Sequence, residues 1–192
     1  MMKFRHIAAA LMGALAIAGQ ASAATFNGAT GASVTDYSSG SALSFDIDLS
    51  QLSTVTLNFT LDAADLAAGQ LSFSSLVRNI SGFGIDNVQV SLNGLAFASA
   101  GTITTDGFVN VVSSGSNAGS AWASFSPSLT SEFYIGNPLA VAGATDWTLS
   151  LAGRQAGDTF SVTVAVPEAE TYAMAVAGLA VLGLALRRRR VA

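Results

Sequence analysis

The chain has 192 residues, a length that fits one domain with targeting segments, and its mean hydropathy is +0.51. It contains no cysteine, so disulfide bonds are excluded and an ordinary hydrophobic core must hold the fold. Ten acidic residues against two arginines give residues 24–166 a formal charge of −8, which argues against nucleic acid as a partner.

The N-terminal segment, residues 1–23, predicts a secretory signal peptide. A short basic start is followed by an apolar, uncharged stretch over residues 7–18, and Ala21 and Ala23 supply the small-residue pattern that signal peptidase accepts. Twelve apolar residues are too few to span a bilayer as a helix. We therefore expect export through the Sec machinery and cleavage after Ala23.

Residues 24–165 predict an all-β body. In residues 54–61, apolar side chains alternate with Thr and Asn, as in a half-buried strand. The same pattern recurs in residues 44–49, 71–73, 88–92, 108–111, 121–125, 132–135, 147–151 and 159–166. Such a series of short strands predicts an antiparallel β-sandwich of jelly-roll type.

Turn residues predict how some of these strands connect. Asn93-Gly94 and Asp106-Gly107 each stand between two strand patterns and are typical of tight hairpins. Residues 61–69 break the alternation, and they are read either as a short helix that ends at Gly69 or as a loop.

The side chains of the body restrict its chemistry. The only histidine and the only lysine lie in the signal peptide, so the body cannot form a Ser–His–Asp triad, a Cys–His pair, a histidine zinc site or a Schiff base. A carboxylate pair of the kind that glycosidases use remains possible. Asp46 and Asp48 fall on one face of a predicted strand, where they are either Ca²⁺ ligands together with Asp36, Asp62 or Asp65, or solvated carboxylates. We favour the second interpretation, and so predict no cofactor.

The two tryptophans differ in phase. Trp147 alternates with Leu149 and Leu151, which predicts a core position. Trp122 is in phase with Ser124, which permits an outward position and contact with a sugar.

The C-terminal segment, residues 166–192, predicts a membrane anchor. Val166-Pro167-Glu168 precedes an apolar run over residues 172–186, which as a helix is about 22 Å long. Four arginines at residues 187–190 follow this run and should stay on the cytoplasmic side of the inner membrane. We expect a single transmembrane helix over residues 172–186.

This segment resembles the PEP-CTERM sorting tail, which consists of a Pro-Glu-Pro-like motif, a short hydrophobic helix and a basic end. Ala169 stands where the second proline usually lies. The residues that carry the resemblance are Val166, Pro167, Glu168, Tyr172, Ala173, Met174, Gly178, Gly183, Arg187, Arg188, Arg189 and Arg190. The resemblance implies a Gram-negative host and an exosortase that recognises the tail. It also implies a membrane-anchored precursor whose body goes to the cell surface or the extracellular matrix.

The leading hypothesis from the sequence is a non-enzymatic surface or matrix protein associated with exopolysaccharide. A carbohydrate-binding module that uses Trp122 is the alternative, and a carboxylate-dependent enzyme acting on glycans is a third hypothesis.

Overall fold

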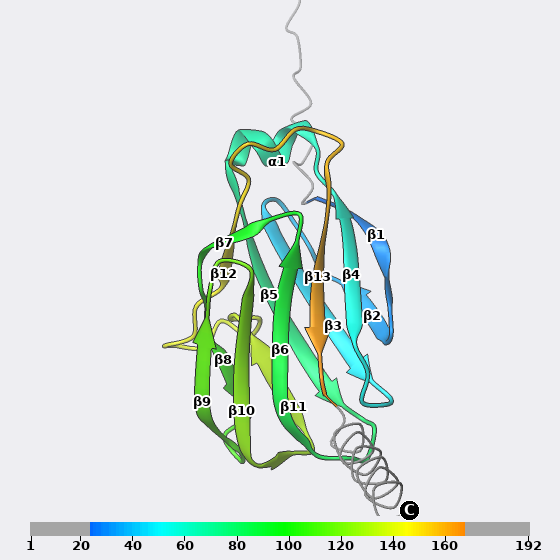
Figure 1. Cartoon of the computed structure of the whole chain (residues 1–192), viewed down its shortest axis with the longest axis vertical. Coiled ribbons are helices and arrows are strands. Elements are labelled where there is room, and N and C mark those ends of the chain that lie inside the picture. Colours follow the sequence, from blue (N-terminus) through cyan, green and yellow to red (C-terminus); the bar gives the residue numbers. More distant parts are fainter. Residues whose placement is uncertain (1–23, 168–192) are drawn as a thin grey trace, which may run out of the picture.

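The computed structural model describes residues 24–167, which form two packed β-sheets and one short helix (Figure 1). The predicted signal peptide, with Ala21 and Ala23, and the predicted transmembrane helix at residues 172–186 lie outside the described residues. Within the described part of the chain, no helix is long and apolar enough to cross a membrane.

The first sheet has six strands in the order β1-β4-β13-β6-β10-β9, all paired antiparallel. Its strands are β1 (Thr25–Thr30), β4 (Val55–Thr60), β6 (Ile85–Asn93), β9 (Asn110–Ser116), β10 (Ser120–Leu129) and β13 (Thr159–Ala165). In β4, Val55, Leu57 and Phe59 are buried while the residues between them are not. As the alternation predicts, one set of β4 side chains faces the core and the other set faces solvent.

The second sheet has seven strands, with β5 near its centre. Its strands are β2 (Ser33–Asp36), β3 (Ala42–Leu49), β5 (Gln70–Asn79), β7 (Ala96–Ser99), β8 (Ile103–Thr105), β11 (Glu132–Ile135) and β12 (Trp147–Ser150). Two short strands pair with successive halves of β5 along one of its sides. The first half pairs with β12, which pairs in turn with β7, and the second half pairs with β11, which pairs in turn with β8.

The prediction that all strands pair antiparallel is wrong for one strand pair. β3 and β5 pair in parallel over eight residue pairs, which mixes the second sheet and departs from an all-antiparallel jelly roll. The cause is the connection: β4 carries the chain back through the first sheet, so β5 starts beside the start of β3. Parallel neighbours need a crossover of this kind. The all-β prediction itself is confirmed.

Both predicted hairpins are wrong. Asn93-Gly94 joins β6 of the first sheet to β7 of the second, and Asp106-Gly107 joins β8 of the second sheet to β9 of the first. The turn residues mark a chain reversal, but they do not specify whether the next strand stays in the same sheet. Gly94 has a φ of +87°, and a Cβ there would lie 2.8 Å from the carbonyl oxygen of Thr159, so this crossing requires glycine.

Residues 61–69 contain a helix, α1 (Ala63–Ala68). Asp62 caps its start by accepting hydrogen bonds from the N–H groups of Ala64 and Asp65, and the Asp65 side chain accepts from the Asp62 N–H. Gly69, in the left-handed conformation, ends the helix. Of the two interpretations of this segment, the helix is therefore correct.

A phenylalanine cluster joins the two sheets. Phe45 of β3 lies with its ring centroid 5.0 Å from that of Phe26 and 5.6 Å from that of Phe59, both in the first sheet. Phe125 and Phe133 make a similar contact at 5.6 Å further along the sandwich. These rings fill a continuous core, which explains how the body holds together without disulfide bonds.

Candidate functional site

The outer surface of the first sheet is uncharged over most of its four central strands, apart from Asp86 near the start of β6, and we call the uncharged part the uncharged face. Its positions are the outward-facing residues that alternate with the buried ones in β4, β13, β6 and β10. They are Thr56, Asn58, Thr60, Asn87, Gln89, Ser91, Asn93, Ser120, Trp122, Ser124, Thr159, Ser161, Thr163 and Ala165. The body holds ten carboxylates, yet none is at these positions.

Strand register arranges the uncharged face in rows. Ser161 of β13 lies between Asn58 of β4 and Asn93 of β6. In the next row, Thr163 lies beside Thr56, and their hydroxyl oxygens are 3.3 Å apart. Neighbouring strands are about 4.8 Å apart and successive rows about 7 Å apart, so donors and acceptors form a regular lattice.

The row of Asn58, Ser161 and Asn93 lies in a hollow of about 400 Å³. Asn27 of β1 and Thr159 complete its polar lining. Each asparagine amide presents both donors and an acceptor, and each hydroxyl does both. The hollow can therefore hydrogen-bond a polar, uncharged ligand without burying a charge.

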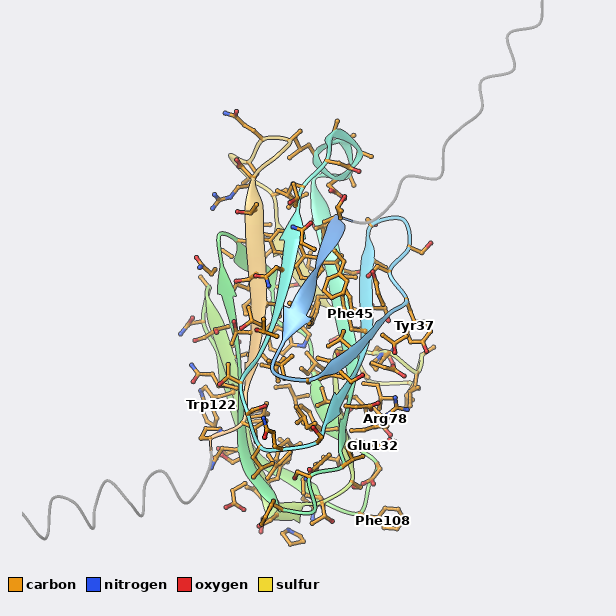
Figure 2. The ribbon with its side chains drawn as sticks, turned by 90° about the vertical axis from the view of Figure 1, so that its right-hand side faces the viewer. Tyr37, Phe45, Arg78, Phe108, Trp122 and Glu132 are labelled. Atoms are coloured by element: carbon orange, nitrogen blue, oxygen red, sulfur yellow. The ribbon has the colours of Figure 1, made fainter. Side chains whose placement is uncertain are left out.

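Trp122 projects outward from β10 with 45% of its surface exposed (Figure 2). Its cross-strand neighbour is Gly115 of β9, and a Cβ there would lie 3.0 Å from three indole atoms. The indole therefore rests against a residue that has no side chain. It also lines a second hollow of about 220 Å³ between β8 and β9, together with Thr102 and Thr104. Trp147, by contrast, is buried, and its Nε1 donates to the carbonyl oxygen of Thr102 at 3.1 Å.

The outer surface of the second sheet carries charge. Asp46 and Asp48 project from β3 towards Arg78 of the adjacent β5, with an Nε–Oδ1 distance of 2.6 Å to Asp48 and an Nη2–Oδ2 distance of 3.4 Å to Asp46. The hydrogen bond and the charge of Asp48 raise the pKa of Arg78 above its ordinary value. Figure 2 shows Arg78 and Trp122 on opposite sides of the sandwich.

Glu132 lies directly across from Arg78 on β11 and accepts a hydrogen bond from the hydroxyl of Tyr134. Partial burial, together with this hydrogen bond, raises the pKa of Tyr134 to about 12. Each of these carboxylates is thus tied to a neighbouring side chain.

The carboxylates considered as Ca²⁺ ligands are only partly brought together. Asp46 and Asp48 are adjacent but shared with Arg78, while Asp62 and Asp65 form the cap of α1. Among residues 24–167 there is no group of three or more His, Cys, Asp or Glu side chains placed to hold a metal ion.

Beyond the last strand, the sequence continues directly into a recognisable signal. Residues 165–190 match the family model of the PEP-CTERM protein-sorting motif. The chain is therefore an exported protein that is anchored by a C-terminal signal before an exosortase processes it. No curated protein and no solved structure matches the chain.

The PEP-CTERM motif starts at the final residue of β13, Ala165. Val166 is still buried against the body and Pro167 is the last described residue, so the other motif residues lie outside the description. Hardly any linker separates the folded body from the sorting signal.

Sequence reasoning missed the asparagine row and the role of Arg78. Alternation already predicts that Asn58 and Ser161 face outward, which is a usable signal. It does not predict that they become neighbours, because that depends on which strands pair. The contact of Trp122 with a sugar stays a prediction.

Proposed function

We propose that the exported body is a non-enzymatic protein of the cell surface or extracellular matrix that binds uncharged exopolysaccharide through the uncharged face. The observation that carries this proposal is the separation of charge: of the ten carboxylates of the acidic body, only Asp86, near the start of β6, is exposed on β4, β13, β6 or β10. The PEP-CTERM motif supports an extracellular destination.

The chemistry of the uncharged face suits sugar. Polysaccharide chains present hydroxyls at the ring edge, which amides and hydroxyls can bind, and C–H groups on the ring face, which stack on an aromatic ring. The row at Ser161 supplies the first kind of contact and Trp122 supplies the second. By strand geometry the two lie about 16 Å apart, so one extended chain can reach both.

Binding is favoured over catalysis by the state of the carboxylates. Asp46 and Asp48 contact Arg78, and Asp62 and Asp65 cap α1, so these four acids already have structural partners. A glycosidase needs two carboxyl groups that are free to act on one bond. Release of reducing sugar from the host polysaccharide by the purified body would contradict a purely binding role.

The proposal is tested with the chain from Ala24 to Pro167 and with extracellular polysaccharide of the producing organism. We expect co-sedimentation of the body with the polysaccharide, and a two- to tenfold loss of affinity for Trp122→Ala, about the range of an aromatic contact. Val141→Ala, at an exposed apolar residue elsewhere, is the matched control. Lack of any binding, together with unchanged biofilm or floc after deletion of the gene, contradicts the function.

A carbohydrate-binding module with one compact site is the second candidate, because Trp122 also borders the smaller hollow between β8 and β9. In that case Trp122→Ala removes binding and Asn58→Ala leaves it unchanged. Binding along the whole uncharged face predicts that both substitutions weaken it.

A further inference from the structure

Large apolar side chains project from one end of the sandwich. Ile80 and Phe83 lie in the β5–β6 loop with 63% and 64% of their surface exposed, and Phe108 lies in the β8–β9 loop with 87% exposed. Both loops are at the lower end of the molecule in Figure 1, and Figure 2 shows Phe108 pointing away from it. We call this the apolar end, defined by Ile80, Phe83 and Phe108.

Hydrogen bonds hold the loops of the apolar end in place. The amide nitrogen of Asn79 donates to the carbonyl oxygens of Phe83 at 2.6 Å and Leu129 at 3.0 Å. The hydroxyl of Ser131 donates to Asp106 at 2.7 Å, next to Phe108. Both apolar loops are thus hydrogen-bonded to the residues around the β10–β11 connection, which holds their backbones in fixed positions.

The chain leaves the body towards this same end. Ala165, the last residue of β13, pairs with Gln89 of β6, and β6 continues for four more residues to its start at Ile85. That distance is about 13 Å along the strand. Only residues 166–171 separate β13 from the apolar run that starts at Tyr172, and six residues reach about 20 Å when fully extended. The tail therefore reaches the membrane close to the level of the loop tips.

We propose that the apolar end contacts the lipid interface while the precursor is anchored, with Ile80, Phe83 and Phe108 inserted beside the tail. Exposed apolar residues gathered at one end of a soluble body mark an interaction surface. The short connection makes the anchoring membrane the surface that they meet. This inference rests on the C-terminal anchoring and not on polysaccharide binding.

The composition of these loops indicates which membrane property matters. Residues 80–84 and 106–109 contain no lysine or arginine, and their one charged residue is the acidic Asp106, so the contact does not need anionic lipid. Three side chains without an anchor bind a bilayer only weakly, as a single short lipid chain does. Cleavage of the tail therefore releases the body from the membrane.

The absence of cysteine makes a direct test possible, because one introduced cysteine can be labelled specifically. The chain from Ala24 to Ala192 is reconstituted in phosphatidylcholine vesicles with a fluorescent label at Phe83→Cys or Phe108→Cys. We expect brominated lipids to quench both labels, but not a label at Val141→Cys, which is an exposed apolar position on another loop. Equal, low quenching at all three positions overturns the proposal.

A second variant separates insertion from mere proximity. Ile80→Ser, Phe83→Ser and Phe108→Ser are combined in a chain labelled at Ser81→Cys. The three side chains are mostly exposed, so the unfolding temperature should stay the same while lipid quenching falls several-fold. Undiminished quenching in this variant shows that the tail alone positions the loops, and it overturns the proposed insertion.

Discussion

At the residue scale, the orientation of the Trp122 indole depends on the residue across from it, Gly115. The indole rests on Gly115, and a methyl group at that position would be 3.0 Å from the ring, close enough to displace it. Gly115 has no left-handed φ, so alanine fits the backbone there. Gly119 of the same hairpin is a matched control, because a Cβ there would lie 4.0 Å from its nearest neighbour, the Asn117 Oδ1 atom.

We predict that Gly115→Ala tilts the indole and weakens polysaccharide binding several-fold, while Gly119→Ala leaves it unchanged. Tryptophan fluorescence checks the cause, since Trp147 is buried and serves as a constant reference. A changed emission spectrum with unaltered affinity would show that the indole orientation is irrelevant to binding.

Tyr134 makes the charged surface sensitive to alkaline pH. Its folded-state pKa of about 12 lies above the ordinary value of 10.0, so the folded protein holds this proton more tightly than the unfolded chain does. The stabilisation is complete below pH 10 and is lost as pH rises towards 12. We predict that Tyr134→Phe removes this part of the pH dependence, measured as the slope of the free energy of unfolding against pH. Identical slopes in the two proteins would contradict this assignment.

At the element scale, α1 contains a buried carboxylate. Burial is the main cause that raises the pKa of Asp65, and the Asp65 Oδ1 atom has no hydrogen-bond partner. Charging Asp65 therefore opposes folding above its folded-state pKa, and acidification relieves that cost as the pH falls towards the unfolded value of 3.8.

We predict that Asp65→Asn stabilises the body at pH 7, because the amide oxygen can still accept from the Asp62 N–H without a charge. The gain should disappear towards pH 4. Asp62→Ala should have the opposite effect, a loss of about 1 kcal/mol from the missing N-cap. Urea unfolding at both pH values measures these changes, and destabilisation by Asp65→Asn at pH 7 would contradict the predicted sign.

The strands themselves show what sequence periodicity can and cannot predict. Residues 54–61 alternate strictly, and β4 has the predicted faces. The alternation predicts a strand only at residues 71–73, but β5 extends to Asn79, because Ser74 and Ser75 are buried and interrupt the pattern. The hydroxyl of Ser75 donates to the carbonyl oxygen of Phe45, a partner on β3 that no local pattern reveals.

For the candidate sites too, the local sequence pattern predicts which face a residue is on but not which residues of other strands it meets. The spacing of Asp46 and Asp48 correctly places them on one face, but Arg78 reaches them only through the parallel pairing of β3 with β5. The sorting motif can be recognised from the sequence because its residues are contiguous and its role does not depend on strand pairing.

At the scale of the whole molecule, the outer faces of the two sheets and the apolar end point in different directions. The last described strand, β13, runs towards the apolar end (Figure 1), so the proposed membrane contact leaves both sheet faces at the sides of the body. In this arrangement the proposed polysaccharide-binding surface is accessible before and after cleavage. The carboxylates of the second sheet disfavour polyanionic glycans, which agrees with the proposed binding of uncharged ones.

The position of β13 limits where the tail can be removed. β13 lies between β4 and β6 and contributes buried Phe160, Val162 and Val164 to the core. Removing it separates the first sheet into two parts, so a chain that ends at Asp158 should fail to fold. A chain that ends at Pro167 keeps the whole core and should unfold cooperatively.

The side chain of Val166 sets the earliest position at which the tail can be cut without loss of stability. It is buried although it follows the last residue of β13, so its loss exposes core surface. We predict that a chain ending at Ala165 is about 1–2 kcal/mol less stable than one ending at Pro167, by urea unfolding. A processing enzyme that releases a fully stable body must therefore cut after Val166. Equal stability of the two chains, or a native fold for the chain ending at Asp158, would remove this constraint on the cleavage position.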